Sequence, residues 1–175
     1  MYYIADIANR MIEEGFNVKI CLIPDEGAEK TQHLIGNLRT RPIVFDSRDE
    51  FVSQFADRVF SGPGVLFSAV TELTPACSQI GERIKGLKVI NHVQSWDMDL
   101  AKEIGREELL PMIETCYKAV PNIVSSSWVA EEIKKIGGEV IAQIPPGIEP
   151  MLFHDRNREE RGDERITFGI IMLKD

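Results

Sequence analysis

Residues 65–94 read VLFSAVTELTPACSQIGERIKGLKVINHVQ, and this stretch decides the expected fold. It begins with one apolar run, 65–70, and ends with another, 88–94, each of a length that suits a buried strand. Between them Thr74 precedes a proline, which is typical of a helix N-terminus with Thr74 as the N-cap, and we expect this helix to reach about Lys85. A strand, a helix and a second strand in this order predict a crossover between parallel strands.

The same alternation extends along most of the chain. Further strands are expected at 18–23, 42–45, 122–125 and 140–144, and helices at 4–12, after 47–50, up to 117 with a break at 111, and at 127–136. Ser47 and Glu50 have the spacing of a capping box, whereas 95–100 is expected to be irregular. The sequence therefore predicts a doubly wound, Rossmann-like α/β domain with a mostly parallel sheet covered on both faces.

Composition narrows the class of protein. The 175 residues include 20 Lys or Arg and 28 Asp or Glu, a net charge of −8, which disfavours general nucleic-acid binding and docking on a strongly anionic membrane. The composition is compatible with weaker peripheral contact with a membrane and with assembly into a homo-oligomer. No apolar run approaches the roughly 20 residues of a membrane span. Three separated cysteines, Cys21, Cys77 and Cys116, never form a CxxC pair, which favours a reducing cytoplasm and gives no metal knuckle.

Ligands of open parallel sheets bind outside the carboxyl ends of the strands, so the residues that follow each strand are the candidate site. His92 is the candidate catalytic residue, because imidazole can donate, accept or shuttle a proton near neutral pH. The alternative is a histidine that is hydrogen-bonded into a strand end without touching a ligand. The candidate binding residues are Asn91, Gln94, Trp96, Asp97, Ser126, Ser127 and Gly147.

Several of these residues have a structural alternative. Trp96 could form an apolar platform for a sugar ring or close the core. Asp97 and Asp99 form a D-x-D that could hold a divalent cation, although the tripeptide is common by chance in an acidic chain. The serines 125–127 could receive a hydroxyl or phosphate oxygen, or serve as a strand end and an N-cap.

Familiar nucleotide and hydrolase motifs are absent from the sequence. It holds no GxGxxG after a strand, no GxxxxGK[ST], no GxSxG and no HExxH. Dehydrogenases that use dinucleotides, P-loop nucleotidases and serine hydrolases are therefore disfavoured. The family resemblance described next implies that neither a cofactor nor a metal is needed, with the nucleotide sugar as a substrate.

Residues 122–153, NIVSSSWVAEEIKKIGGEVIAQIPPGIEPMLF, resemble the end of the N-terminal domain in retaining GT-B glycosyltransferases of family 4. The shared features are a strand ending in serine, a helix beginning xWVxEE and a Pro-x-Gly-Ile-Glu turn. Residues 4–23 resemble the first helix and second strand of that family. The strand at 88–97 shares a histidine with many members and a VQ segment with a subset similar to rhamnosyltransferases.

The resemblance implies transfer of a hexose from a nucleotide sugar to a saccharide or other acceptor, with retention and without a metal. It places His92 near the reacting sugars, with Gln94 and Trp96 shaping the acceptor side. Residues 1–154 would form the acceptor-side domain, 155–165 a linker charged at 9 of 11 positions, and 166–175 a stub similar to the first strand of the donor domain.

The resemblance also leaves parts of the family pattern without a counterpart. The usual first strand and the E-x₇-E motif that binds the nucleotide sugar are not found, so we expect a chain cut at both ends and inactive alone. The apolar run 166–172, ITFGIIM, has the character to fill the slot of the first strand, or else packs loosely at the domain edge.

Three other functions remain open. A GT-A glycosyltransferase would use Asp97 and Asp99 with manganese and bind divalent metal tightly. A nucleotide-sugar epimerase of GT-B architecture would interconvert free sugar nucleotides without an acceptor. A non-catalytic Rossmann-like module would bind carbohydrate or a protein partner, and its binding would survive His92→Ala.

Overall fold

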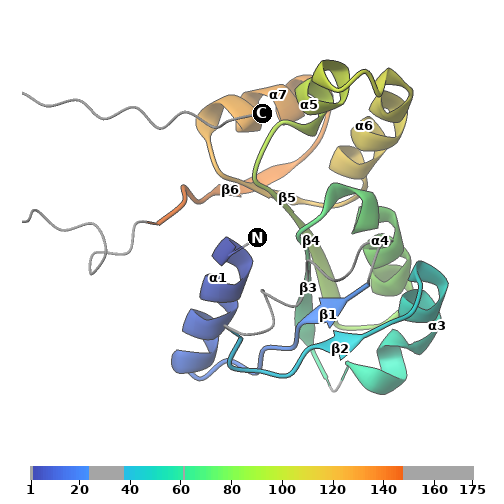
Figure 1. The fold of residues 1–175 in the computed structure, drawn as a ribbon, viewed down its shortest axis with the longest axis vertical. Coiled ribbons are helices and arrows are strands. Elements are labelled where there is room, and N and C mark those ends of the chain that lie inside the picture. The colour runs from blue at the N-terminus through green and yellow to red at the C-terminus, as the bar shows by residue number, and fades with distance from the viewer. Residues whose placement is uncertain (1, 24–37, 61, 148–175) are drawn as a thin grey trace, which may run out of the picture.

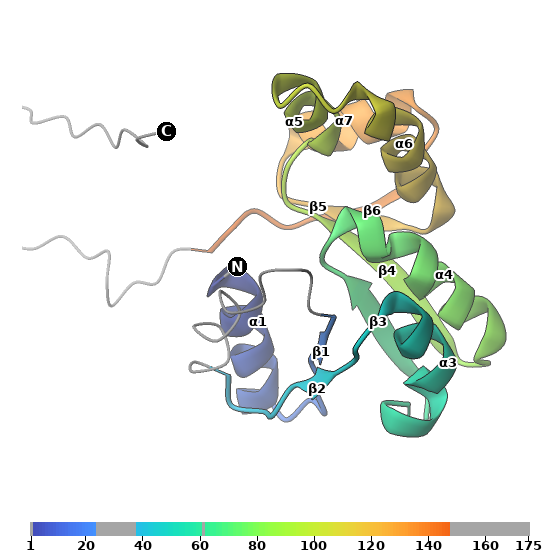
Figure 2. The ribbon, with the colours of Figure 1, turned by 45° about the vertical axis from the view of Figure 1, so that its right-hand side comes forward.

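The computed structural model describes residues 2–23, 38–60 and 62–147 (Figures 1 and 2). The helices are α1 (Tyr2–Glu13), α3 (Arg48–Arg58), α4 (Thr74–Arg83), α5 (Asp97–Glu103), α6 (Leu110–Ala119) and α7 (Ser127–Lys135), with 3₁₀ turns η2 (Thr71–Leu73) and η3 (Glu107–Leu109). The strands are β1 (Cys21–Leu22), β2 (Ile43–Val44), β3 (Gly64–Ser68), β4 (Leu87–Val93), β5 (Asn122–Val124) and β6 (Val140–Gln143).

All of these strands pair in parallel. The larger sheet has the order β3-β4-β5-β6, and β1 and β2 form a separate pair. Consecutive strands of the larger sheet are neighbours joined by helical crossovers, as the alternation predicts. The expected α/β class with parallel strands is confirmed, and the topology is consistent with a Rossmann-like fold. The described strands form two sheets where a single sheet was expected.

Two hydrophobic clusters hold the helices on the strands. One gathers the last residues of β4 and β5, Val93 and Val124, with Trp96 and with buried residues of α5, α6 and α7 that include Tyr117 and Ile133. The other contains Phe45, Phe51, Phe55, Ala76, Cys77 and Ile80. Partly buried residues of β1, β2, β3 and β4 all pack against this second cluster, so one core joins the two sheets. Figure 2 shows α3 to α7 on one side of the strands and α1 on the other.

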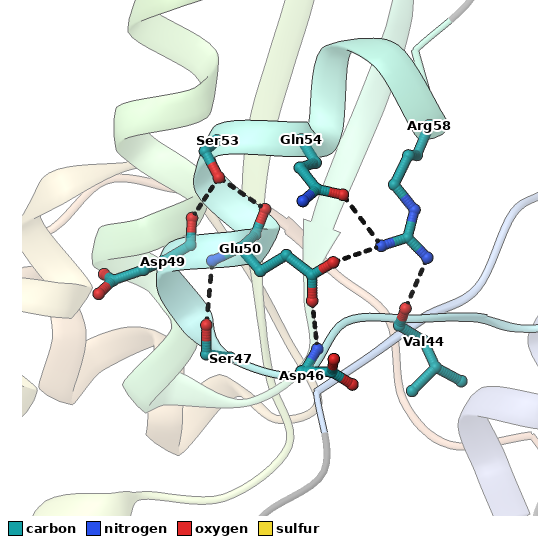
Figure 3. A network of polar contacts seen from close by, with 8 residues as sticks. All are labelled: Val44, Asp46, Ser47, Asp49, Glu50, Ser53, Gln54 and Arg58. Carbon is teal, nitrogen blue, oxygen red and sulfur yellow. Dashed lines mark hydrogen bonds and ion pairs between the residues drawn. The ribbon is translucent and has the colours of Figure 1, made fainter.

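Helix α3 begins where the capping-box spacing predicts. The Ser47 side chain accepts a hydrogen bond from the Glu50 N–H at 3.1 Å, and the Glu50 carboxylate accepts one from the Asp46 N–H at 2.5 Å (Figure 3). The carboxylate thus reaches one residue beyond the capping serine. At the other end, Arg58 donates to Glu50 at 2.9 Å and to the Val44 carbonyl at 2.7 Å, so the helix is also tied to β2.

Three local expectations are wrong. Thr74 is not the N-cap of α4, because η2 leads directly into the helix and Leu73 takes that position. Thr74 is instead fully buried in the first turn, with its hydroxyl 3.0 Å from that of Ser68.

Residues 97–103, within and beyond the segment expected to be irregular, form α5. The apolar periodicity of 4–12 places Ile4, Ile7, Ala8, Met11 and Ile12 on one face of the helix, but Ile7 is 36% exposed, whereas Ala5 and Ala8 are buried.

The expected linker 155–165 and the apolar run 166–172 lie outside the described residues. None of the helices in the described ranges has both the length and the apolar character needed to cross a membrane.

We predict that Ser47→Ala lowers the free energy of unfolding by about 1 kcal/mol, because it leaves the Glu50 N–H of the first helical turn without its acceptor. Ser53→Ala is the matched control in the same helix, since the Ser53 hydroxyl only donates to carbonyls already in the helix, those of Asp49 and Glu50. Its effect should stay within about 0.5 kcal/mol. Urea unfolding followed by circular dichroism measures both, and equal losses would contradict the assignment of the cap.

Candidate functional site

The carboxyl ends of β4 and β5 are tied together directly. The Ser125 N–H donates to the Val93 carbonyl at 3.2 Å, and the Ser125 hydroxyl donates to the Gln94 carbonyl at 2.9 Å. The residues that follow these two strands therefore lie at one edge of the sheet, as expected for parallel neighbours. The Ser125 hydroxyl is thus used in this contact between the ends of the two strands.

His92 lies near the end of β4, opposite Ile123 of β5. Its side chain is half-buried, and desolvation lowers the pKa of the imidazole from the ordinary value of 6.5. The ring is therefore mainly neutral at pH 7, so that one nitrogen donates and the other accepts. A neutral imidazole of this kind can hold a sugar hydroxyl by either atom of its O–H group.

Asn91 does not lie with His92, because successive side chains of a strand point to opposite faces. It is fully buried, and its amide donates to the Asn122 side chain at 3.0 Å. A ligand at the sheet edge cannot reach it in this structure. We therefore leave Asn91 out of the site, and its place in the fold is structural.

The two tryptophans differ in exposure, and of the two roles considered for Trp96 the structure shows the one in the core. Trp96 is only 9% exposed and stacks on Tyr117 with ring centroids 5.2 Å apart and planes 13° from parallel, so it closes the core. Trp128 is 51% exposed in the first turn of α7. The periodicity of α7 could have indicated this, because the inward positions are Val129, Ala130 and Ile133. Trp128 is the aromatic surface that a ligand at this edge can reach.

Asp97 is the centre of a hydroxyl network. Its carboxylate accepts hydrogen bonds from Thr71, from Ser95 at 3.0 Å and from the Tyr117 hydroxyl at 3.0 Å. The Tyr117 oxygen in turn accepts from the Asp97 N–H at 3.1 Å. Burial, with the Asp97 charge as a smaller cause, raises the pKa of Tyr117, which remains a protonated donor. Asp97 thus joins η2 and the start of α5 to α6.

Asp99 has a different partner. Its carboxylate lies 3.4 Å from the Lys102 ammonium on the exposed side of α5. The two acidic residues of the D-x-D therefore serve different contacts. Within the described ranges, no three His, Cys, Asp or Glu side chains gather as a metal site would require.

The expected serines and glycine are reached by solvent to different degrees. Ser126 is the N-cap of α7, and its side chain accepts from the Val129 N–H at 3.2 Å. Ser127 and Gln94 are exposed at the same edge, whereas Gly147 is exposed beyond the end of β6, at the end of the described chain. The edge thus combines exposed polar side chains with the N–H groups of the first turn of α7.

A hollow of about 250 Å³ lies elsewhere, at the edge where β4 begins. It is lined by Ser78, Gly81, Glu82, Leu87, Val89, Ala119 and Val120. None of the candidate site residues lines it. Its lining is mostly apolar, with Ser78 and Glu82 as the polar side chains, and we assign it no role.

The cysteines do not have the character of nucleophiles. Burial raises the pKa of Cys21, Cys77 and Cys116 to about 11, and the negative charge of Glu72 and Asp97 adds to the effect at Cys116. A thiol with such a pKa is protonated at neutral pH and reacts slowly.

Asp97→Asn is expected to lower the free energy of unfolding by about 1–3 kcal/mol, because an amide nitrogen would face hydroxyl donors at a partly buried position. Asp99→Asn is the matched control, since its ion pair with Lys102 is exposed and should contribute less than about 0.5 kcal/mol. Chemical denaturation of both variants checks this. A larger loss for Asp99→Asn would rule out the proposed role of Asp97.

The lowered pKa of His92 predicts a pH dependence. The unfolded chain takes up this proton near pH 6.5 and the folded chain only at lower pH, so the folded state loses stability as the pH falls below about 6.5. The loss in unfolding free energy between pH 7.5 and 5.5 should therefore be greater for the wild type than for His92→Gln. Urea titrations at the two pH values measure it, and identical losses in the two proteins would refute the prediction.

Comparisons with protein-family models, with curated proteins and with solved structures return no match to this chain. The functional interpretation therefore depends on the residues and on the geometry described above.

Proposed function

We propose that this chain is the acceptor-side domain of a retaining GT-B glycosyltransferase that transfers a hexose from a nucleotide sugar to a saccharide or other acceptor. The resemblance of residues 122–153 to that family suggests the activity. The observation that carries the proposal is the half-buried His92 near the sheet edge at which Gln94, Ser127 and Trp128 are exposed.

Each of these residues has a chemical role in the proposal. The neutral imidazole of His92 holds a hydroxyl of a reacting sugar, and the Gln94 amide donates to or accepts from a neighbouring one. The exposed face of Trp128 packs against the apolar C–H face of a pyranose ring, which is one of the two roles considered for Trp96. Ser126, Ser127 and the first N–H groups of α7 receive a hydroxyl or phosphate oxygen. Gly147, which is exposed, belongs to the proposed binding residues only through the family resemblance.

The other half of the reaction lies with a donor domain. That domain binds the nucleotide sugar and supplies most of the electrostatic stabilisation of the leaving diphosphate. On this proposal the described domain contributes acceptor binding and the position of His92. It uses no metal of its own, and Asp97 supports the site through the hydroxyl network.

A non-catalytic carbohydrate-binding module is the second candidate, and the exposure of Trp128 favours it equally. An aromatic platform binds a sugar without help from a histidine. The two functions differ in what they require of His92. In the glycosyltransferase His92 touches the acceptor sugar, whereas in the module it does not.

Saturation-transfer NMR with a panel of mono- and disaccharides tests the proposed binding. We expect saturation transfer to a saccharide and at least about tenfold weaker binding in Trp128→Ala, a change of about 1.4 kcal/mol. Phe16→Ala is the matched control, because Phe16 is 61% exposed but precedes β1 and lies at the amino edge of the strands. Equal effects of the two substitutions would argue against a site at Trp128.

His92→Ala then separates the two candidates. Weaker saccharide binding supports the glycosyltransferase, and unchanged binding supports the module. Incubation with a panel of nucleotide sugars and the bound saccharide completes the test. Transfer by these 175 residues alone would overturn the proposal that a second domain is needed.

A further inference from the structure

The chain leaves β4 through a turn at residues 94 and 95. Val93 is 2% and Trp96 9% exposed, and both belong to the core cluster that contains Tyr117. The two residues between them are exposed. In a continuing strand the side chains of residues 93 and 96 would point to opposite faces of the sheet. Because both pack into one core cluster, the backbone turns between them.

The backbone carbonyls show the same turn. Along a strand, successive carbonyls point alternately toward the neighbouring strand on one side and on the other. The carbonyls of Val93 and Gln94 nevertheless accept hydrogen bonds from one residue, Ser125. The Ser125 N–H donates to Val93 at 3.2 Å and the hydroxyl donates to Gln94 at 2.9 Å. Since the N–H is already used, only a side-chain donor can hold the second carbonyl toward β5.

Ser125 also lies next to the start of α7. The following residue, Ser126, is the N-cap of that helix, and Trp128 stands two positions after the cap, 51% exposed. Buried residues in the first turn of α7 belong to the same core cluster as the end of β4. Ser125 therefore links the segment that carries Gln94 to the helix that carries Trp128.

The contact between Ser125 and Gln94 lies where water can reach it. Gln94 is exposed, so a water molecule can replace the Ser125 hydroxyl at its carbonyl, and the loss in stability is small. Water does not tie this carbonyl to β5, however, and the turn is then free to take other directions. Losing the hydroxyl should therefore leave the fold intact and make the direction of the Gln94 side chain less defined.

We propose that Ser125 is a positioning residue of the saccharide site. Its hydroxyl holds the turn after β4 in the direction that brings the Gln94 amide to a ligand bound against Trp128. This role rests on the proposed function, since it matters only if Gln94 and Trp128 contact a saccharide. Ser125 acts through Gln94 and does not itself touch the ligand, because its hydroxyl proton is donated to the carbonyl.

Saturation-transfer NMR titrations test this role, with maltose, lactose and the methyl glycosides of glucose, galactose and mannose as probes. For a probe whose binding depends on Trp128, Ser125→Ala should raise the dissociation constant about fivefold, the loss expected for one neutral hydrogen bond. Ser125→Thr keeps the hydroxyl and should bind within about twofold of the wild type. Binding by Ser125→Thr as weak as that by Ser125→Ala would overturn the proposal.

Ser53→Ala controls for the loss of a hydroxyl in general. The Ser53 hydroxyl also donates to backbone carbonyls, but it lies within α3 and serves no part of this site. This variant should bind the probe as the wild type does. Circular dichroism should give the same spectrum for the wild type and for each serine variant.

A double-mutant cycle separates positioning from a purely structural role. Gln94→Ala removes the amide that the turn directs, and should weaken binding by itself. In that background Ser125→Ala should change the dissociation constant by less than about twofold, because the group through which it acts is gone. An equal loss in both backgrounds would mean that Ser125 supports the fold alone, and the positioning role would be wrong.

Two other results distinguish failure of this role from failure of the saccharide site. If binding depends on Trp128 but is unchanged in Ser125→Ala or in Gln94→Ala, the positioning role is overturned and the saccharide site stands. If none of the probes binds in a way that depends on Trp128, the saccharide site fails and the positioning role fails with it.

Discussion

A strand inside a parallel sheet satisfies its N–H and C=O groups only when a neighbour lies on each side, and this requirement shapes the whole molecule. Parallel neighbours cannot be joined by a tight turn, so a helical crossover must follow each strand. The crossovers return the chain to the same edge each time. The carboxyl ends of β4 and β5 therefore meet, which places His92 close to the edge that carries Gln94 and Ser127.

Polar side chains inside the strands serve the same requirement. The buried amide nitrogen of Asn122 lies within 2.8–3.1 Å of the carbonyls of Tyr117, Val120 and Glu139, at the end of α6 and before β6, and these carbonyls share its two N–H donors. The Asn122 oxygen accepts from Asn91 across β4 and β5. Each carbonyl left unpaired in the interior would cost about 1–3 kcal/mol. Asn91, which the sequence suggested as a binding residue, is part of this buried network and is therefore structural.

Local patterns predicted what local physics decides. The apolar runs located every described strand, and the spacing of Ser47 and Glu50 located the start of α3. The failures lie where a distant residue decides. Trp96 is buried because Tyr117 stacks on it, and Thr74 is drawn into the first turn of α4 beside Ser68. A pattern read along the chain contains neither contact, so it placed Trp96 in the site and overlooked Trp128.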